Sequence, residues 1–194
     1  MKRVLLGVLV MASVSCGSMT REGTASSYLV IAEMDAASGA DPEEFAGDLE
    51  SDVLTVVDGV GTIFADVARV TFSLALKDPG PAGAPLTPTA NNAITVDRYR
   101  VRFIRSDGRN REGVDVPYGF DGAFTATVFD RTRASFTLVR AQAKAEAPLA
   151  ALATSLIVVS TIAEITFYGH DQTGREVITT ARVGVHFANW DDPE

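Results

Sequence analysis

The sequence predicts an all-β fold, an antiparallel sandwich of about seven or eight strands with one or two short helices. Apolar residues recur at every second position in run after run along the chain, which is typical of strands with one buried and one exposed face. The runs are joined by segments rich in Gly, Pro and Asp rather than by helices long enough to connect parallel strands. No repeat of fixed period is evident in the sequence, which disfavours a solenoid or a propeller.

The predicted strands are the segments in which this alternation is clearest. Within residues 66–77 every even position from Ala68 to Leu76 is apolar, while the odd positions include Arg69 and Lys77. In residues 177–187, Val183 and Phe187 share one face while Arg182 and His186 lie on the other. The remaining predicted strands are 28–34, 94–104, 123–129, 135–139 and 163–168, with 53–57 as a weaker candidate.

The connections between these strands carry turn residues. The sequence GHDQTGR at 169–175 joins two alternating runs through a loop that contains glycine, which predicts a β-hairpin. Residues 106–113 are polar and residues 78–89 are rich in Pro and Gly, so both predict loops without regular structure.

Two short helices are predicted. Asp41 precedes Pro42 and is followed three residues later by Glu44, a pattern that is typical of a helix N-terminus. The alanine-rich stretch 144–153 predicts a second helix. The apolar residues 156–159 that follow predict a strand or a buried linker.

The first fifteen residues have the layout of a secretory signal peptide. Lys2 and Arg3 provide a positive start, residues 4–12 are apolar, and small residues lead up to Cys16. The apolar run is far shorter than the ~20 residues that a membrane-spanning helix needs. We therefore expect this segment to be removed rather than to anchor the chain.

Cys16 and its small neighbours resemble the lipobox of bacterial lipoproteins, although Ser13 stands where that motif usually has leucine. The resemblance implies cleavage before Cys16, which then carries a thioether-linked diacylglycerol and an acylated amine. Gly17 rather than aspartate after the cysteine implies sorting to the outer membrane in a Gram-negative cell. The alternative is ordinary cleavage after Ala12 or Ser15, which leaves a secreted protein with an incidental cysteine.

The rest of the chain has the size of one domain. Residues 16–27 are rich in small polar residues and lack hydrophobic periodicity, which predicts a flexible tether. The hydrophobic fraction of 46% is sufficient for a core. With one cysteine, the chain cannot form an intramolecular disulfide. We therefore expect a signal peptide at 1–15, a tether at 16–27 and a single β-sandwich domain at 28–194.

The charge balance argues against a nucleic-acid partner. Cleavage before Cys16 removes Lys2 and Arg3, which leaves 15 basic against 25 acidic residues and a net charge of about −10. Nucleic acids and anionic membrane surfaces attract proteins with a basic surface. We expect neither as a partner, and we expect no cofactor.

The segment AEITFYGHDQTGREVITTARVGVHF at 163–187 resembles the last hairpin of immunoglobulin-like domains of bacterial envelopes. The resemblance implies that the all-β domain is an immunoglobulin-like β-sandwich. It implies no particular function, because such sandwiches serve many.

The sharpest surface feature is the sequence DRYRVRFIR at 97–105. Because side chains alternate along a strand, Arg98, Arg100 and Arg102 are expected to project together from one face. Three guanidinium groups in a row suit a carboxylate-rich glycan, a phosphate or an acidic partner. The alternative is that acidic side chains of neighbouring strands pair with them, each exposed pair contributing ~0.2 to 1 kcal/mol.

Trp190 is the second candidate for ligand binding. It is the only tryptophan, and it follows the last predicted strand, whereas most phenylalanines fall on predicted core faces. An exposed indole suits stacking on a sugar ring, and the alternative is that Trp190 covers the end of the sandwich.

Signatures of catalysis and metal binding are missing from the sequence. It contains no G-x-S-x-G, HExxH or P-loop motif. The two histidines, His170 and His186, lack further ligands at the spacing of a structural zinc site. Asp35, Asp171 and the acidic pair at 191–192 offer oxygen ligands for calcium, but no EF-hand loop is present. We expect no catalytic residues and no metal site.

Together these features favour a non-enzymatic lipoprotein of the cell envelope, an interaction or structural module tethered to a membrane through Cys16, with an envelope protein as its partner. The alternative is a binding domain for an anionic glycan or another cell-surface ligand, in which Arg98, Arg100, Arg102 and Trp190 make the contacts. If the lipobox is not used, the protein is secreted. A hydrolase is the third possibility and would need a histidine as its base.

Overall fold

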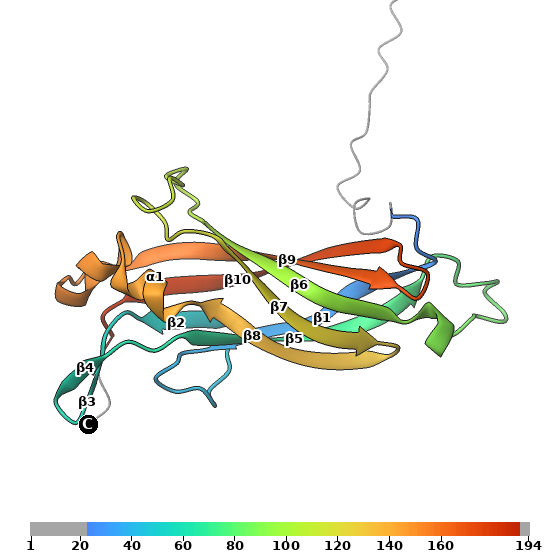
Figure 1. Cartoon of the computed structure of the whole chain (residues 1–194), viewed down its shortest axis with the longest axis horizontal. Coiled ribbons are helices and arrows are strands. Elements are labelled where there is room, and N and C mark those ends of the chain that lie inside the picture. The colour runs from blue at the N-terminus through green and yellow to red at the C-terminus, as the bar shows by residue number, and fades with distance from the viewer. Residues whose placement is uncertain (1–22, 191–194) are drawn as a thin grey trace, which may run out of the picture.

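A computed structural model describes residues 23–190, which form two packed β-sheets in one elongated body (Figure 1). The three-stranded sheet has the order β1 (Ser27–Ala37), β5 (Asp66–Leu76), β8 (Arg131–Val139). The five-stranded sheet has the order β2 (Asp48–Asp52), β10 (Glu176–Ala188), β9 (Val159–Asp171), β6 (Ile94–Ile104), β7 (Phe120–Val128). A small hairpin of β3 (Thr55–Val57) and β4 (Val60–Thr62) stands apart, and the helical segments are η1 (Ala90–Asn92), α1 (Ala141–Ala145) and η2 (Leu149–Thr154).

The predicted all-β class is confirmed. The strand predicted at 94–104 coincides with β6. The strand predicted at 66–77 is one residue longer than β5, and β10 extends one residue beyond the predicted 177–187 at each end. The hairpin predicted at 169–175 is the turn that joins β9 to β10, which pair antiparallel. Where side chains alternate between core and solvent, the local pattern alone is enough to locate the strand.

One strand pair departs from the antiparallel expectation. β2 lies parallel to the end of β10, with Asp48 opposite Gly184 and Asp52 opposite Ala188. A side chain at position 184 would begin 2.1 Å from the Asp48 carboxylate, so glycine at this position lets β2 lie against β10. The sequence did not predict β2, because its residues DLESD are mostly acidic.

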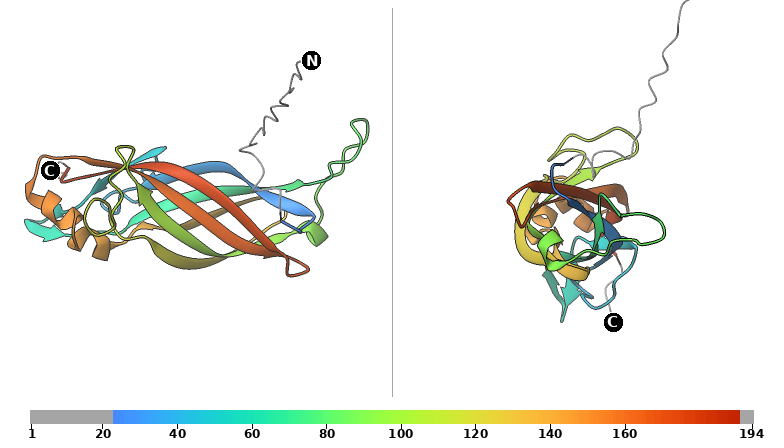
Figure 2. Two further views of the ribbon diagram at one scale, coloured as in Figure 1. Left: turned by 90° about the horizontal axis from the view of Figure 1, so that it is seen from above. Right: turned by 90° about the vertical axis from the view of Figure 1, so that its right-hand side faces the viewer.

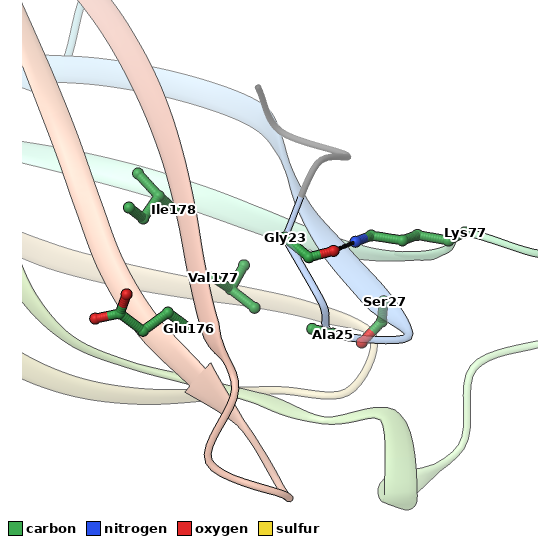
Figure 3. Close-up of a pocket in the computed structure, with 7 residues that line it drawn as sticks. All are labelled: Gly23, Ala25, Ser27, Lys77, Glu176, Val177 and Ile178. Atoms are coloured by element: carbon green, nitrogen blue, oxygen red, sulfur yellow. Dashed lines mark hydrogen bonds between the residues drawn. The ribbon is translucent and has the colours of Figure 1, made fainter. Parts of the chain in front are cut away.

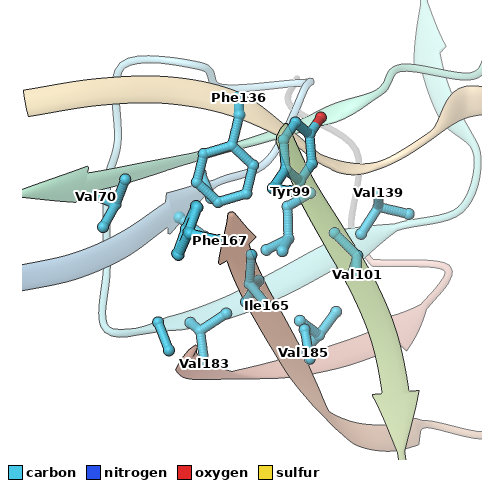
Figure 4. Close-up of a cluster of buried hydrophobic side chains, with 14 of the residues drawn as sticks. Val70, Tyr99, Val101, Phe136, Val139, Ile165, Phe167, Val183 and Val185 are labelled. Atoms are coloured by element: carbon cyan, nitrogen blue, oxygen red, sulfur yellow. The ribbon is translucent and has the colours of Figure 1, made fainter. Parts of the chain in front are cut away.

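The core lies between the two sheets and is rich in aromatic rings (Figure 4). Phe167 of β9 meets Phe72 of β5 edge to face, with 5.0 Å between ring centroids. Tyr99 of β6 crosses to the opposite sheet, where its hydroxyl donates to the Thr137 carbonyl oxygen at 3.1 Å. Gly122 of β7 permits this crossing, because a Cβ atom there would lie 2.2 Å from the Tyr99 ring.

The helix predicted from Asp41 is wrong. Residues 39–43 form turns, in which the Glu44 amide donates to the Asp41 carbonyl. Ala46 then pairs with Ala36 at the end of β1, which folds the chain back on itself. The local capping pattern is present, but the chain between Ala36 and Ala46 closes through turns instead of a helix.

The second predicted helix, at 144–153, is replaced by α1 and η2. Pro148 separates the two, since proline lacks the amide that would continue a helix. The following residues Leu156, Ile157 and Val158 are exposed, so the prediction of a strand or buried linker there is wrong. β9 begins only at Val159, where Phe187 of β10 becomes available as its partner.

The first described residues pack against the domain. Ala25 and Ser27, which we expected at the end of the tether, are buried. Within the described residues no helix is both long and apolar enough to cross a membrane. The predicted signal peptide, Cys16 and the aspartates at 191–192 lie outside the described residues.

Candidate functional site

A groove of about 920 Å³ runs along β2 between the turn that follows β1 and the end of β10. Five carboxylates line it, and they come from the turn and from β2: Asp41, Glu44, Asp48, Glu50 and Asp52. His186 and Trp190 line it from the end of β10, and the lining contains no lysine or arginine. The groove is therefore negatively charged, with an indole ring at one side.

Trp190 is held in place by Asp52. The Trp190 backbone amide donates to Asp52 Oδ1 at 3.1 Å, and the indole Nε1 donates to the His186 carbonyl at 3.4 Å. Asp52 Oδ2 accepts a hydrogen bond of 2.5 Å from the Thr55 hydroxyl. Asp52 is itself buried, so the residue acts as a fixed acceptor at the base of the Trp190 side of the groove.

The opposite wall of the groove, the turn after β1, is held by Asp66 of β5. The Gly39 amide donates to Asp66 Oδ1 at 2.9 Å. A Cβ atom at Gly39 would lie 2.3 Å from the Ala65 carbonyl oxygen, so this close approach of the two backbones requires glycine. Glycine at position 39 therefore allows the turn to lie directly over the start of β5.

A buried ion pair, Asp66 with Lys144 of α1, lies beneath this wall. Lys144 Nζ is 2.7 Å from Asp66 Oδ1, and the side chains of Lys144 and Asp66 are 1% and 0% exposed. Lys144 also donates to the Asp52 carbonyl at 2.7 Å, and the Ser51 hydroxyl donates to Asp66 Oδ2 at 2.6 Å. Burial raises the pKa of the Asp66 carboxyl, and the hydrogen bonds from Lys144, Ser51 and Gly39 oppose that rise.

The three predicted arginines do project from one face, the outer face of the five-stranded sheet, where all three are exposed. Two of them have partners there. The Arg98 guanidinium lies 4.1 Å from the centroid of the Tyr168 ring, and Arg100 pairs with Asp121 at 3.3 Å. Among the described residues Arg102 forms no ion pair, and Glu164, which lies opposite it, pairs with Arg182 of β10.

The histidines and candidate calcium ligands are separate from one another. His170 contacts Asp97 at 3.2 Å, and His186 contacts the Ser160 hydroxyl at 3.0 Å. Asp35 forms a two-pronged pair with an arginine of β5, and Asp171 accepts hydrogen bonds within its own hairpin. Within residues 23–190 no group of three or more His, Cys, Asp or Glu side chains is placed to hold a metal ion.

A second, smaller cavity of about 170 Å³ lies at the other end of the molecule (Figure 3). Its lining includes Ala25, Ser27 and the start of β10 at Val177. Lys77 closes one side by donating to the Gly23 carbonyl. The cavity marks where the first described residues fold over the sheet, and no cluster of polar side chains converges on it.

Sequence reasoning identified Trp190 but missed the carboxylates that surround it. A signal was present in residues 48–52, where acidic side chains alternate with Leu49 and Ser51. The placement of Trp190 beside β2 depends on the parallel pairing with β10, which the pattern of a five-residue segment does not specify. Trp190 follows β10 and lines the groove, whereas the three arginines lie on β6 and line no part of it, so they do not form one site.

Comparison of the chain with protein-family models, curated proteins and solved structures gives no match. Function must therefore be inferred from the chemistry of the chain itself.

Proposed function

We propose that the protein is a non-enzymatic envelope lipoprotein whose domain, tethered through Cys16, binds a cationic segment of a partner protein in the acidic groove. The observation that supports this function best is the groove itself, in which five carboxylates and an indole ring line the same surface and no lysine or arginine is present to neutralise the carboxylates. A lysine or arginine side chain fits such a surface, because it can pair with a carboxylate and lie on an aromatic face.

The position of the groove suits a tethered module. β1 begins at Ser27, opposite Leu76, and ends at Ala37, opposite Val67. The lining of the groove begins at the Ala37 end of that strand, so Ser27 and the groove lie at opposite ends of β1. β1 itself runs along the elongated body (Figure 2). A membrane anchor ahead of Ser27 would leave the groove accessible to a partner.

We also propose that the sandwich is immunoglobulin-like. Taken in chain order, β1, β5 and β8 correspond to strands A, B and E, and β6, β9 and β10 to strands C, F and G. β7 then takes the place of strand C′ beside C. This correspondence supports the fold class and carries no function with it.

Binding of an oligo-lysine peptide tests the groove. We expect the peptide to change the fluorescence of Trp190, the only tryptophan, and to bind less tightly as salt rises. Replacing both Asp48→Asn and Glu50→Gln removes two charges from the lining, and we expect about fivefold weaker binding. Glu176→Gln, an exposed carboxylate at the other end of β10, is the matched control and should bind as the unmodified chain does. Equal affinity for oligo-lysine and oligo-glutamate would rule the groove out as a cation site.

A second candidate function is binding of an anionic glycan on the outer face of the five-stranded sheet. The observation that favours it is Arg102, whose guanidinium has no acidic partner among the described residues, beside Arg98 and Arg100 on the same strand. Arg100 already has an acidic partner, Asp121, which leaves less charge for a ligand than the sequence implied. Arg98 lies over the neutral Tyr168 ring and keeps its charge.

The triple variant Arg98→Ser, Arg100→Ser, Arg102→Ser tests this second function. If the face binds heparin or a polyuronate, the variant should lose about tenfold or more in affinity, because three charged contacts are removed together. Isothermal titration at two salt concentrations measures the loss, and circular dichroism shows whether the fold persists. A folded triple variant with undiminished binding would exclude this face.

A further inference from the structure

We infer that the buried ion pair of Asp66 and Lys144 is a positioning unit that sets the distance between the two walls of the groove. This inference rests on the proposed function only in taking the groove as the site of ligand binding. The hydrogen bonds from which we infer it exist without any ligand.

Four segments that are remote in sequence meet at Asp66. Its two carboxylate oxygens accept from the Gly39 amide, the Ser51 hydroxyl and Lys144 Nζ, at 2.9, 2.6 and 2.7 Å. Gly39 belongs to the turn that forms one wall, Ser51 to the strand at the base of the groove, and Lys144 to α1. A single side chain of β5 therefore determines where the turn and β2 lie relative to each other.

Lys144 extends this connection to the other wall. Its Nζ donates to the backbone carbonyl of Asp52 at 2.7 Å, and the carboxylate of the same residue accepts from the Trp190 amide. A continuous path of hydrogen bonds thus runs from Gly39 through Asp66, Lys144 and Asp52 to Trp190. Both members of the ion pair are almost completely buried, so they can influence a ligand only through the groove walls.

A purely structural role and a positioning role predict different results. If the pair only stabilises the fold, its loss lowers the free energy of unfolding but leaves Trp190 unchanged in the molecules that remain folded. If the pair positions the walls, its loss moves Trp190 in the folded state, where the indole would become more accessible to solvent.

The test uses the fluorescence of Trp190 in the full chain. The double variant Lys144→Met, Asp66→Asn removes both buried charges while nearly keeping the side-chain volumes, and the asparagine oxygen can still accept from Gly39 or Ser51. We expect red-shifted emission, stronger quenching by acrylamide and about fivefold weaker binding of oligo-lysine, which corresponds to the loss of about one hydrogen bond in the path. The milder variant Ser51→Ala keeps the ion pair and should shift Trp190 less in the same direction.

The control is Ile94→Ala, which opens a cavity in the core at the far end of β6 and lowers stability without touching the path. Its folded state should keep the emission and quenching of the unmodified chain. Unchanged emission and quenching in the folded double variant would overturn the inference. Because the fluorescence measurement needs no ligand, its outcome is independent of whether oligo-lysine binds.

Discussion

We expect replacement of Lys144 by methionine to lower the free energy of unfolding by about 3–5 kcal/mol. Methionine fills much of the space of the lysine side chain, but it leaves the Asp66 carboxylate buried without its cation. An unpaired charge at a site with no access to water costs far more than the same charge at the surface. The hydrogen bond to the Asp52 carbonyl is lost as well.

Urea denaturation followed by far-UV circular dichroism measures this loss. The double variant Lys144→Met, Asp66→Asn should recover most of it, since neutralising both members of a buried pair is often close to neutral for stability. The control is Arg182→Met, which also replaces a cation by methionine but breaks only the exposed pair with Glu164. This control substitution should lower the free energy of unfolding by at most about 1 kcal/mol. A loss below about 1 kcal/mol for Lys144→Met would contradict a buried, uncompensated charge at Asp66.

The parts of the fold that the sequence predicted are those set by local alternation. β6 and β10 each bury about one side chain in two along their length, and no tertiary contact is needed to recognise that pattern. The projection of Arg98, Arg100 and Arg102 from one face follows from the same rule, and the structure confirms it. What the rule does not specify is which side chains on neighbouring strands lie opposite them.

The parts that the sequence did not predict depend on contacts between distant segments. Lys144 and Asp66 are separated by 78 positions, and nothing near Lys144 in the sequence marks it as a buried residue. The turn at 39–43 follows from the pairing of Ala36 with Ala46, which overrides the capping pattern around Asp41. The strand before Trp190 is recognised from local alternation, whereas the carboxylates near Trp190 are brought there by contacts between distant segments. The sequence therefore indicated Trp190 but not the carboxylates around it.

We expect the Cys16→Ser chain, produced in a Gram-negative host, to lose its acyl groups completely and to leave the membrane fraction. The prediction follows from the resemblance of the N-terminus to a lipobox, in which the cysteine sulfur carries the diacylglycerol. Each buried methylene of an acyl chain contributes about 0.8 kcal/mol, and two or more chains together give stable anchoring. Serine is close to cysteine in size but cannot form the thioether, so only the attachment is removed.

Mass spectrometry of the N-terminal peptide and fractionation of the host membranes measure the two effects. Ser18→Ala, two residues beyond the predicted cleavage site, is the matched control and should remain acylated and membrane-bound. Lipid anchoring would be contradicted if Cys16 carried no acyl group and if the unmodified chain and the Cys16→Ser chain were both found in the soluble fraction. That result would favour ordinary cleavage and secretion. The proposed binding of a cationic partner in the groove does not depend on this outcome, because the lining residues lie between positions 36 and 190 and include none from the predicted signal peptide or tether.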